Sequence, residues 1–179
     1  DGKSIKSDSL EAKKNFGFVP DNPDMFLKLR GIEYLTFMAD VYDVSEEKRK
    51  ERIENLTKKF DIYNELNDQI QSYSHGMRQK IVICGALLSE PKNWILDEPM
   101  TGLDPKSSFD LKEMMKEHAK TGKTVFFSTH VLEVAEKLCD RVGIINKGKL
   151  VFVGTFEELK KEFKKEDSLE KLFLEITEQ

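Results

Sequence analysis

Short apolar runs alternate along this chain with longer stretches whose apolar residues recur at helical spacing. Three of the runs are Phe16–Val19, Trp94–Asp97 and Thr124–Ser128. This alternation is typical of a parallel sheet that is covered by helices. The sequence therefore predicts an α/β fold.

One long stretch, residues 25–71, interrupts the alternation because it holds no good strand. Its apolar residues recur at helical spacing in two groups. The first group is Ile32, Leu35, Met38 and Tyr42, and the second is Ile53, Leu56 and Phe60. We expect an all-helical insertion between strands, which is a subdomain rather than a separate domain.

The remaining elements follow from capping and turn residues. Ser74 can cap a helix that runs to about Ser89, and a second helix should lie between Pro105 and Gly122. The turn in 142–153 predicts a hairpin. Further helices are expected at 131–139 and around Leu169, Leu172, Phe173 and Ile176.

The composition is that of a soluble domain. The chain has 179 residues, of which 39% are apolar and 35% are charged. The net charge of −4 offers no basic surplus that would argue for nucleic acid as a partner. No signal peptide is seen, and no apolar run is long enough to cross a membrane. We expect a cytoplasmic location, with any link to a membrane passing through a partner.

Two adjacent carboxylates end the apolar run Trp94–Asp97. They belong to Asp97 and Glu98, and Pro99 follows them. Hydrolysis of a nucleotide needs one carboxylate to help hold Mg²⁺ and another to orient and deprotonate the attacking water. An ordinary strand that ends in an acidic turn would look the same, so the pair alone is a weak indication of a catalytic site.

Two other positions fit phosphate chemistry. Ser74 and Gly76 begin a predicted helix, where a hydroxyl and backbone N–H groups offer a site for an anion. His130 follows the run Thr124–Ser128, where it can donate a hydrogen bond to a γ-phosphate. The simpler interpretations are a capped helix and a surface histidine.

Four short motifs occur in a fixed order along the chain. They are YSHGM at 73–77, WILDEP at 94–99, TGLDP at 101–105 and FFSTH at 126–130. They are similar to the signature, Walker B, D-loop and H-loop motifs of the ATP-binding cassette (ABC) family, and the chain resembles that family over essentially its whole length. The ending at 168–175 resembles bacterial cassettes that pair with ABC-2-type export permeases.

The resemblance implies a P-loop NTPase-like ABC ATPase sheet with an inserted α-helical subdomain. It places the helical subdomain and signature in 22–90, and the Walker B, D-loop and H-loop part of the core in 91–155. The C-terminal helices would occupy 156–179. All three parts would belong to one ABC ATPase domain.

The resemblance also implies catalytic roles at the ends of the strands. Asp97 would bind Mg²⁺, Glu98 would be the general base, and His130 would contact the γ-phosphate of ATP. Asp21 stands where the family has its Q-loop glutamine; it is shorter and anionic at pH 7, and it can reach a Mg²⁺-bound water.

Partners are implied by the same resemblance. Two ABC ATPase subunits would sandwich two ATP molecules head to tail, with Ser74, His75 and Gly76 reaching the nucleotide of the other subunit and Asp104 linking the two sites. The helical subdomain around 26–42 would dock on a membrane permease. The protein would then be peripheral on the inner face of the cell membrane.

The chain departs from the family at the Q-loop position, where Asp21 stands, and in the signature. Tyr73, His75 and Met77 replace three of the five residues of the usual LSGGQ signature, while Ser74 and Gly76 are kept.

A further departure concerns the phosphates. No G-x-x-x-x-G-K-[ST] motif occurs in the 179 residues, and Gly2-Lys3-Ser4 lacks the upstream glycines. We expect an N-terminally truncated domain, shortened by design or in its gene, that neither binds ATP tightly nor hydrolyses it alone.

Two alternatives to a transporter ATPase stay open. One is a non-transport ABC protein that acts on ribosomes or DNA, although these usually carry two cassettes or long insertions. The other is a catalytically dead module that only binds a permease, against which the presence of Glu98 and His130 argues.

Overall fold

The computed structural model describes residues 2–162 and 173. The chain divides into two compact units, Asp1–Ser128 and Thr129–Gln179. Within the described part of the chain, every helix is too short or too polar to span a bilayer.

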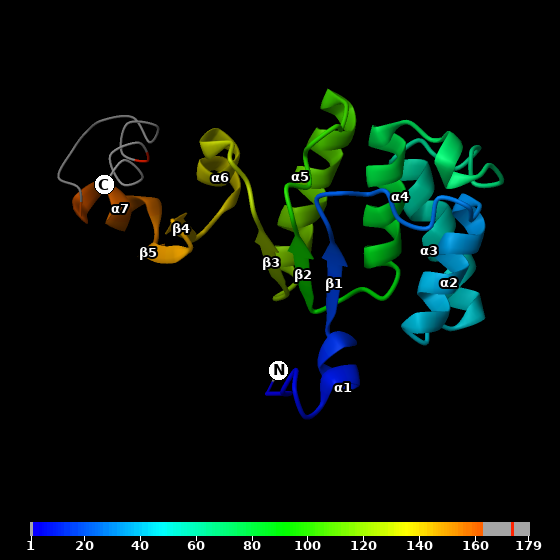
Figure 1. Cartoon of the computed structure of the whole chain (residues 1–179), viewed down its shortest axis with the longest axis horizontal. Helices are drawn as coiled ribbons and strands as arrows, with labels where there is room; N and C mark the ends of the chain where they lie inside the picture. The colour runs from blue at the N-terminus through cyan, green and yellow to red at the C-terminus, as the bar shows by residue number, and fades with distance from the viewer. Residues whose placement is uncertain (1, 163–172, 174–179) are drawn as a thin grey trace. The chain divides into compact units, whose positions relative to one another are not determined.

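The first unit is built on a parallel sheet of three strands (Figure 1). In chain order they are β1 (Phe16–Val19), β2 (Asn93–Leu96) and β3 (Thr124–Phe127), and β2 lies in the middle. Every residue of β2 has a register partner on each side, so the strands end level with one another. The parallel sheet that the alternation predicted is confirmed.

Helices account for the segment between β1 and β2. The described helices there are α2 (Gly31–Val41), α3 (Glu46–Lys59), the short 3₁₀ helix η1 (Ile70–Ser72) and α4 (His75–Leu87). The predicted helical insertion is confirmed, and its described residues form no strand beyond an isolated bridge between Arg30 and Gln69.

Helix α4 lies at the centre of the first unit. Its residues from 81 to 87 are all buried, because the helix contacts α2, α3 and β1 and is apolar on every side there. Figure 1 shows α4 between the sheet and the other two helices. Helix α4 therefore fixes the helical insertion to the sheet.

Two more helices complete the first unit. The short α1 (Ser9–Lys13) leads into β1, and α5 (Pro105–Lys120) links β2 to β3. Pro105 occupies the first turn of α5, as predicted, and Gly122 follows the helix with a φ of +80°.

The second unit contains a helix, a hairpin and another helix. They are α6 (Leu132–Leu138), the antiparallel strands β4 (Val142–Asn146) and β5 (Lys149–Gly154), and α7 (Phe156–Glu162). The predicted hairpin is confirmed, and its turn residues Lys147 and Gly148 have φ values of 48° and 75°. A small apolar core joins Ile144, Phe152 and Leu159. The predicted last helix, apart from Phe173, lies outside the described residues.

Candidate functional site

The sheet brings three segments of the chain to one edge. Val19, Leu96 and Phe127 are register partners and are the last residues of their strands. Because the carboxyl ends of parallel strands meet at the same edge, the segments that follow these strands begin side by side. Asp21 and the pair Asp97–Glu98 therefore follow the ends of neighbouring strands. Figure 1 shows the arrows of β1 and β2 pointing the same way, side by side.

A serine connects the two carboxylate positions at this edge. The Ser128 hydroxyl donates a hydrogen bond to Oδ1 of Asp97 (2.5 Å) and accepts one from the backbone N–H of Glu98 (2.9 Å). The backbone N–H of Ser128 donates to the carbonyl of Leu96 (3.0 Å), which extends the β2–β3 ladder by one residue. We call Asp97, Glu98 and Ser128 the sheet edge.

Sequence reasoning missed Ser128 as a member of the site. Its motif, FFSTH, was interpreted only through His130. The signal that could have found Ser128 is its position immediately after β3, level with the end of β2, because a hydroxyl there faces the residues that follow β2.

Glu98 has an unusual backbone conformation. Its φ is 43°, in the left-handed region that residues with a Cβ seldom adopt, and its carbonyl accepts a hydrogen bond from Thr101 N–H (3.1 Å). Such strain costs on the order of 1 kcal/mol and tends to accumulate at functional sites. The turn directs the chain away from β2 directly after Asp97.

The chemistry of the sheet edge fits Mg²⁺ held together with a nucleotide. Within the described residues, no group of three or more His, Cys, Asp or Glu side chains is placed to hold a metal ion. Mg²⁺ in phosphate sites usually takes only one or two carboxylates and completes its shell with phosphate oxygens and water. Asp97, with one oxygen fixed by Ser128, and the exposed Asp21 provide that number.

The start of α4 is the second part of the candidate site. Ser74 is the N-cap residue, and its hydroxyl oxygen accepts a hydrogen bond from Met77 N–H (3.3 Å), as the capping prediction expected. That bond uses an oxygen lone pair and leaves the hydroxyl proton to be donated elsewhere. With the backbone N–H groups of the first turn, the hydroxyl makes an anion site chemically possible.

The start of α4 packs directly on the loop after β2. A Cβ on Gly76 would lie 2.6 Å from the carbonyl oxygen of Gly102, and a Cβ on Gly102 would collide with the ring of His75. Gly102 also has a φ of +75°. Both close approaches need glycine, so the signature-like segment and the D-loop-like segment form one packed unit within this chain.

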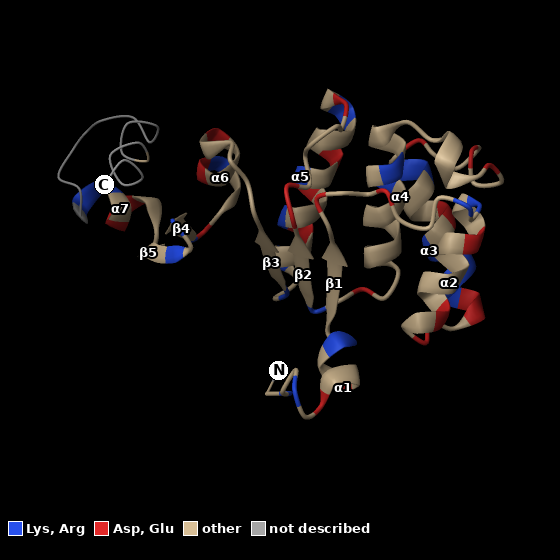
Figure 2. Ribbon diagram, in the orientation of Figure 1, with Lys and Arg blue, Asp and Glu red and all other residues tan. Residues whose placement is uncertain are grey.

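Asp104 is bound from two sides in the same region. Its carboxylate caps α5 by accepting hydrogen bonds from Ser107 N–H (2.9 Å) and Ser107 Oγ (2.7 Å), and it pairs with Lys80 of α4 (2.8 Å). The hydrogen bond from Lys80 holds the pKa of Asp104 well below its usual range, and the bonds from Ser107 act in the same direction. Figure 2 shows the basic residues on α4 and the acidic residues along the β2–α5 loop.

These contacts define a second region, which we call the helix junction. Its members are Ser74, His75, Gly76, Gly102 and Asp104. The structure thus brings four of the predicted site residues together around the first two turns of α4. The roles predicted for them toward a nucleotide stay predictions.

His130 belongs to the second compact unit. It is exposed and stands two residues before the start of α6. Its predicted role at the γ-phosphate stays a prediction.

Comparison with known proteins assigns a family to this arrangement. Residues 1–101 match the family model described as "ABC transporter". The chain is 36% identical over 179 residues to the ABC-type transporter ATP-binding protein EcsA of Bacillus subtilis (strain 168), covering 99% of this chain and 72% of EcsA. It is 33% identical to the linearmycin resistance ATP-binding protein LnrL of the same organism, covering 88% of this chain and 51% of LnrL.

Solved structures agree with the sequence relatives. An ATP-binding subunit of an ABC transporter superimposes with a TM-score of 0.93 at 31% identity, over 98% of this chain and 73% of that subunit. The cbiO1 protein from Clostridium perfringens has the same fold, with a TM-score of 0.72 at 24% identity, over 97% of this chain and 70% of that one. The chain thus spans between about half and three quarters of these relatives.

Proposed function

This chain belongs to the ABC transporter family, and on that premise we propose that it supplies a large part of the ATP-hydrolysing domain of a transporter subunit. The observation that carries the proposal is the hydrogen-bonded sheet edge, in which Ser128 binds both Asp97 and the backbone of Glu98. An oriented carboxylate beside a second one is the arrangement that nucleotide hydrolysis requires.

In the proposed reaction, the residues of the sheet edge, Asp21 and His130 each have a distinct task. Bound Mg²⁺ would offset charge on the phosphates and fix their geometry. Asp97 would hold the ion, and Asp21 would contact its water shell. Glu98 would accept a proton from the attacking water, and Ser128 would keep Asp97 and the Glu98 backbone in register. His130 would donate a hydrogen bond to the γ-phosphate.

The helix junction would act on a nucleotide held by a second subunit. Two chains would meet head to tail, so that Ser74, His75 and Gly76 of one approach the ATP of the other. The capped start of α4 supports this, because it presents a hydroxyl proton and backbone N–H groups together. Asp104 would stabilise the junction within its own chain and link the two sites across the interface.

A membrane permease is the proposed second partner. Phe26 and Phe37 have ring centroids 5.5 Å apart and stay 45% and 44% exposed, and Val41, four residues after Phe37 on α2, is 51% exposed. Exposed aromatic groups of this kind are typical of surfaces that bind another protein. Docking there would place the subunit in the cytoplasm against the membrane. The name of the relative LnrL, which refers to linearmycin resistance, favours export, and the resemblance of the ending at 168–175 favours an ABC-2-type permease.

The test of this function measures Mg²⁺-dependent ATP hydrolysis. It uses these 179 residues joined at their N-terminus to a P-loop segment of the G-x-x-x-x-G-K-[ST] kind, which we call the joined protein. We expect hydrolysis, and we expect Ser128→Ala to lower the turnover rate about three- to tenfold, since a charge-assisted hydrogen bond is lost. Ser72→Ala, which removes an exposed hydroxyl bonded to a backbone carbonyl, is the matched control. A joined protein that folds but hydrolyses no ATP would refute the proposal.

A further inference from the structure

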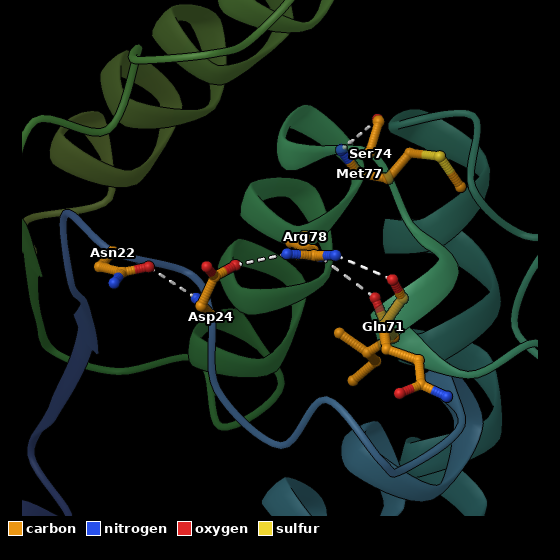
Figure 3. Close-up of polar contacts among 7 residues, drawn as sticks. Asn22, Asp24, Gln71, Ser74, Met77 and Arg78 are labelled. Atoms are coloured by element: carbon orange, nitrogen blue, oxygen red, sulfur yellow. Dashed lines mark hydrogen bonds and ion pairs between the residues drawn. The ribbon is translucent and has the colours of Figure 1, made fainter.

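Arg78, in the first turns of α4, connects three separate segments of the chain. Its guanidinium donates to the carbonyls of Ile70 (3.2 Å) and Gln71 (2.8 Å) in η1, and to Oδ1 of Asp24 (2.7 Å) in the loop after β1. Figure 3 shows the guanidinium between Asp24 and Gln71. The Arg78 side chain is only 21% exposed, so water competes weakly for these contacts.

The loop after β1, which holds Asp24, has a hydrogen bond of its own. Asp24 N–H donates to the side-chain oxygen of Asn22 (2.9 Å), which ties Asp24 to the residue that follows Asp21. Figure 3 shows Asn22, Asp24 and Arg78 in one continuous line of hydrogen bonds. The position of Asp21 is therefore linked to Arg78 through three residues of loop.

On α4 itself, backbone hydrogen bonds connect Arg78 to Ser74, the serine of the signature-like motif. Arg78 N–H donates to the carbonyl of Ser74 (3.0 Å), one helical turn earlier, and Met77 N–H donates to the Ser74 hydroxyl. Helical turns are stiff, because each residue is fixed by backbone hydrogen bonds. A displacement of Arg78 thus carries Ser74 with it.

We propose that Arg78 is a positioning residue that couples the two nucleotide sites of the dimer. The inference rests on the proposed function, in which Asp21 faces the nucleotide of its own chain and Ser74 faces that of the other. Occupation of the first site would restrain Asp21 at one end of the loop 21–24, and Arg78 would transmit that restraint to the start of α4. Coupling of this kind requires a physical element that both sites bias, and the line from Asp21 through Asp24 and Arg78 to Ser74 is such an element.

The geometry of arginine is essential to this role. A planar fork of N–H groups can bind a carboxylate and two carbonyls at once, whereas the ammonium of lysine acts as a point charge. Arg78→Lys should therefore keep part of the link to Asp24, while Arg78→Gln should lose it.

Arg52 offers a matched control at the other end of α4. Its guanidinium donates to the carbonyl of Leu88 (2.6 Å) and pairs with Glu90, and its side chain is also 21% exposed. Arg52 belongs to α3, and like Arg78 it binds a backbone carbonyl and a carboxylate, but its partners end or follow α4 and lie in no site segment. Arg52→Gln should lower the free energy of unfolding about as much as Arg78→Gln does, but it should leave the loop 21–24 and the ATP dependence of hydrolysis unchanged.

The first experiment needs no nucleotide. Amide hydrogen exchange of the 179-residue chain should be about five- to tenfold faster across 21–24 in Arg78→Gln than in the wild type, because the loop loses its anchor. Arg52→Gln should leave that segment unchanged. Equal exchange in the wild type and Arg78→Gln would overturn the link.

The second experiment follows ATP hydrolysis by the joined protein across a range of ATP concentrations. We expect a Hill coefficient above 1 in the wild type and Arg52→Gln. It should fall toward 1 in Arg78→Gln, with half-saturation raised about fivefold. Asp24→Asn should change the Hill coefficient and half-saturation as Arg78→Gln does. The double variant should show little further change, since both substitutions break the same link. Arg78→Lys should lie between the wild type and Arg78→Gln.

The outcomes separate this inference from the proposed function. Absence of hydrolysis in the wild type would refute the proposed function itself. Three other outcomes, each seen together with hydrolysis, would refute only the role of Arg78. The first is a Hill coefficient of 1 in the wild type, and the second is strict additivity of the effects of Arg78→Gln and Asp24→Asn. The third is an equal change of the Hill coefficient in Arg78→Gln and Arg52→Gln.

Discussion

The sheet edge and the helix junction lie in the same compact unit but depend on different physics. At the sheet edge, strand register places Asp97, Glu98 and Ser128, and side-chain hydrogen bonds then orient them. At the helix junction, two glycines let the backbone of one segment touch the other, with a Cβ on Gly76 falling 2.6 Å from Gly102. A change at the sheet edge should thus affect chemistry more than folding, and a change at the helix junction should affect folding first.

The largest effect is expected from Glu98→Gln at the sheet edge. The amide cannot accept a proton from water, so turnover of ATP by the joined protein should fall at least about 100-fold. Binding of Mg-ATP and the free energy of unfolding should stay near the wild-type values, because the hydrogen bond from the Glu98 backbone to Ser128 is kept. Steady-state hydrolysis, equilibrium titration and urea unfolding measure the three quantities.

Glu113→Gln is the control for this comparison, since Glu113 lies within α5, pairs with Lys116 on the same helix and belongs to neither region. It should hydrolyse ATP normally. Wild-type turnover in Glu98→Gln would remove Glu98 from the role of base. A large loss of stability would break the distinction between the two regions.

The next effect is expected at the helix junction, from Gly102→Ala. The new Cβ would meet the His75 ring, and the backbone would be held at a φ of +75°. We expect the free energy of unfolding of the 179-residue chain to fall by about 2–3 kcal/mol, as overpacking adds to backbone strain.

Gly122→Ala isolates the contribution of strain. Gly122 has a similar φ of +80°, but a Cβ there would have nothing within 4 Å. Its variant should lose only about 1 kcal/mol, and urea unfolding of both variants gives the difference. Equal losses at Gly102 and Gly122 would show that the contact with His75 costs nothing, and the helix junction would then not be tightly packed.

The sequence predicted part of each region and missed another part. An apolar run that ends in Asp97-Glu98 reveals a strand and its acidic end, and a serine at Ser74 before a helical pattern reveals a cap. Both signals are local. The hydrogen bonds of Ser128 depend on the register between β2 and β3, and the contact of Gly76 with Gly102 depends on how α4 meets a loop 26 residues later; local patterns contain neither.

The same reasoning explains why the sequence revealed only part of the role of Asp104 and none of the contacts of Arg78. The pattern Asp104-Pro105 predicts a helix start, but it cannot reveal Lys80 as the second partner. Arg78 follows the signature-like motif in the chain, yet its carboxylate partner, Asp24, is 54 residues away. Ion pairs between distant segments become visible only when the fold has placed them.

The smallest effect is expected from Asp104→Asn, which tests whether charge contributes to the helix junction. Asparagine keeps the cap on α5 but removes the ion pair with Lys80, so the loss at pH 7 should be about 0.5–1 kcal/mol for this half-exposed carboxylate. The folded-state pKa of Asp104 lies below its unfolded value of about 3.9. The wild type therefore keeps its higher free energy of unfolding, relative to Asp104→Asn, above that pH. As the pH falls further, the unfolded chain takes up the proton first, and the advantage shrinks.

Urea unfolding of the wild type and Asp104→Asn at pH 7, 5, 4 and 3.5 measures this dependence. The difference between the two proteins should be constant from pH 7 to pH 5 and should decrease below about pH 4. It should also decrease at pH 7 in high salt, because part of the pair is open to solvent. If the difference were the same at every pH and salt concentration, the ion pair would contribute nothing, and close packing between Gly76 and Gly102 would alone hold the helix junction together.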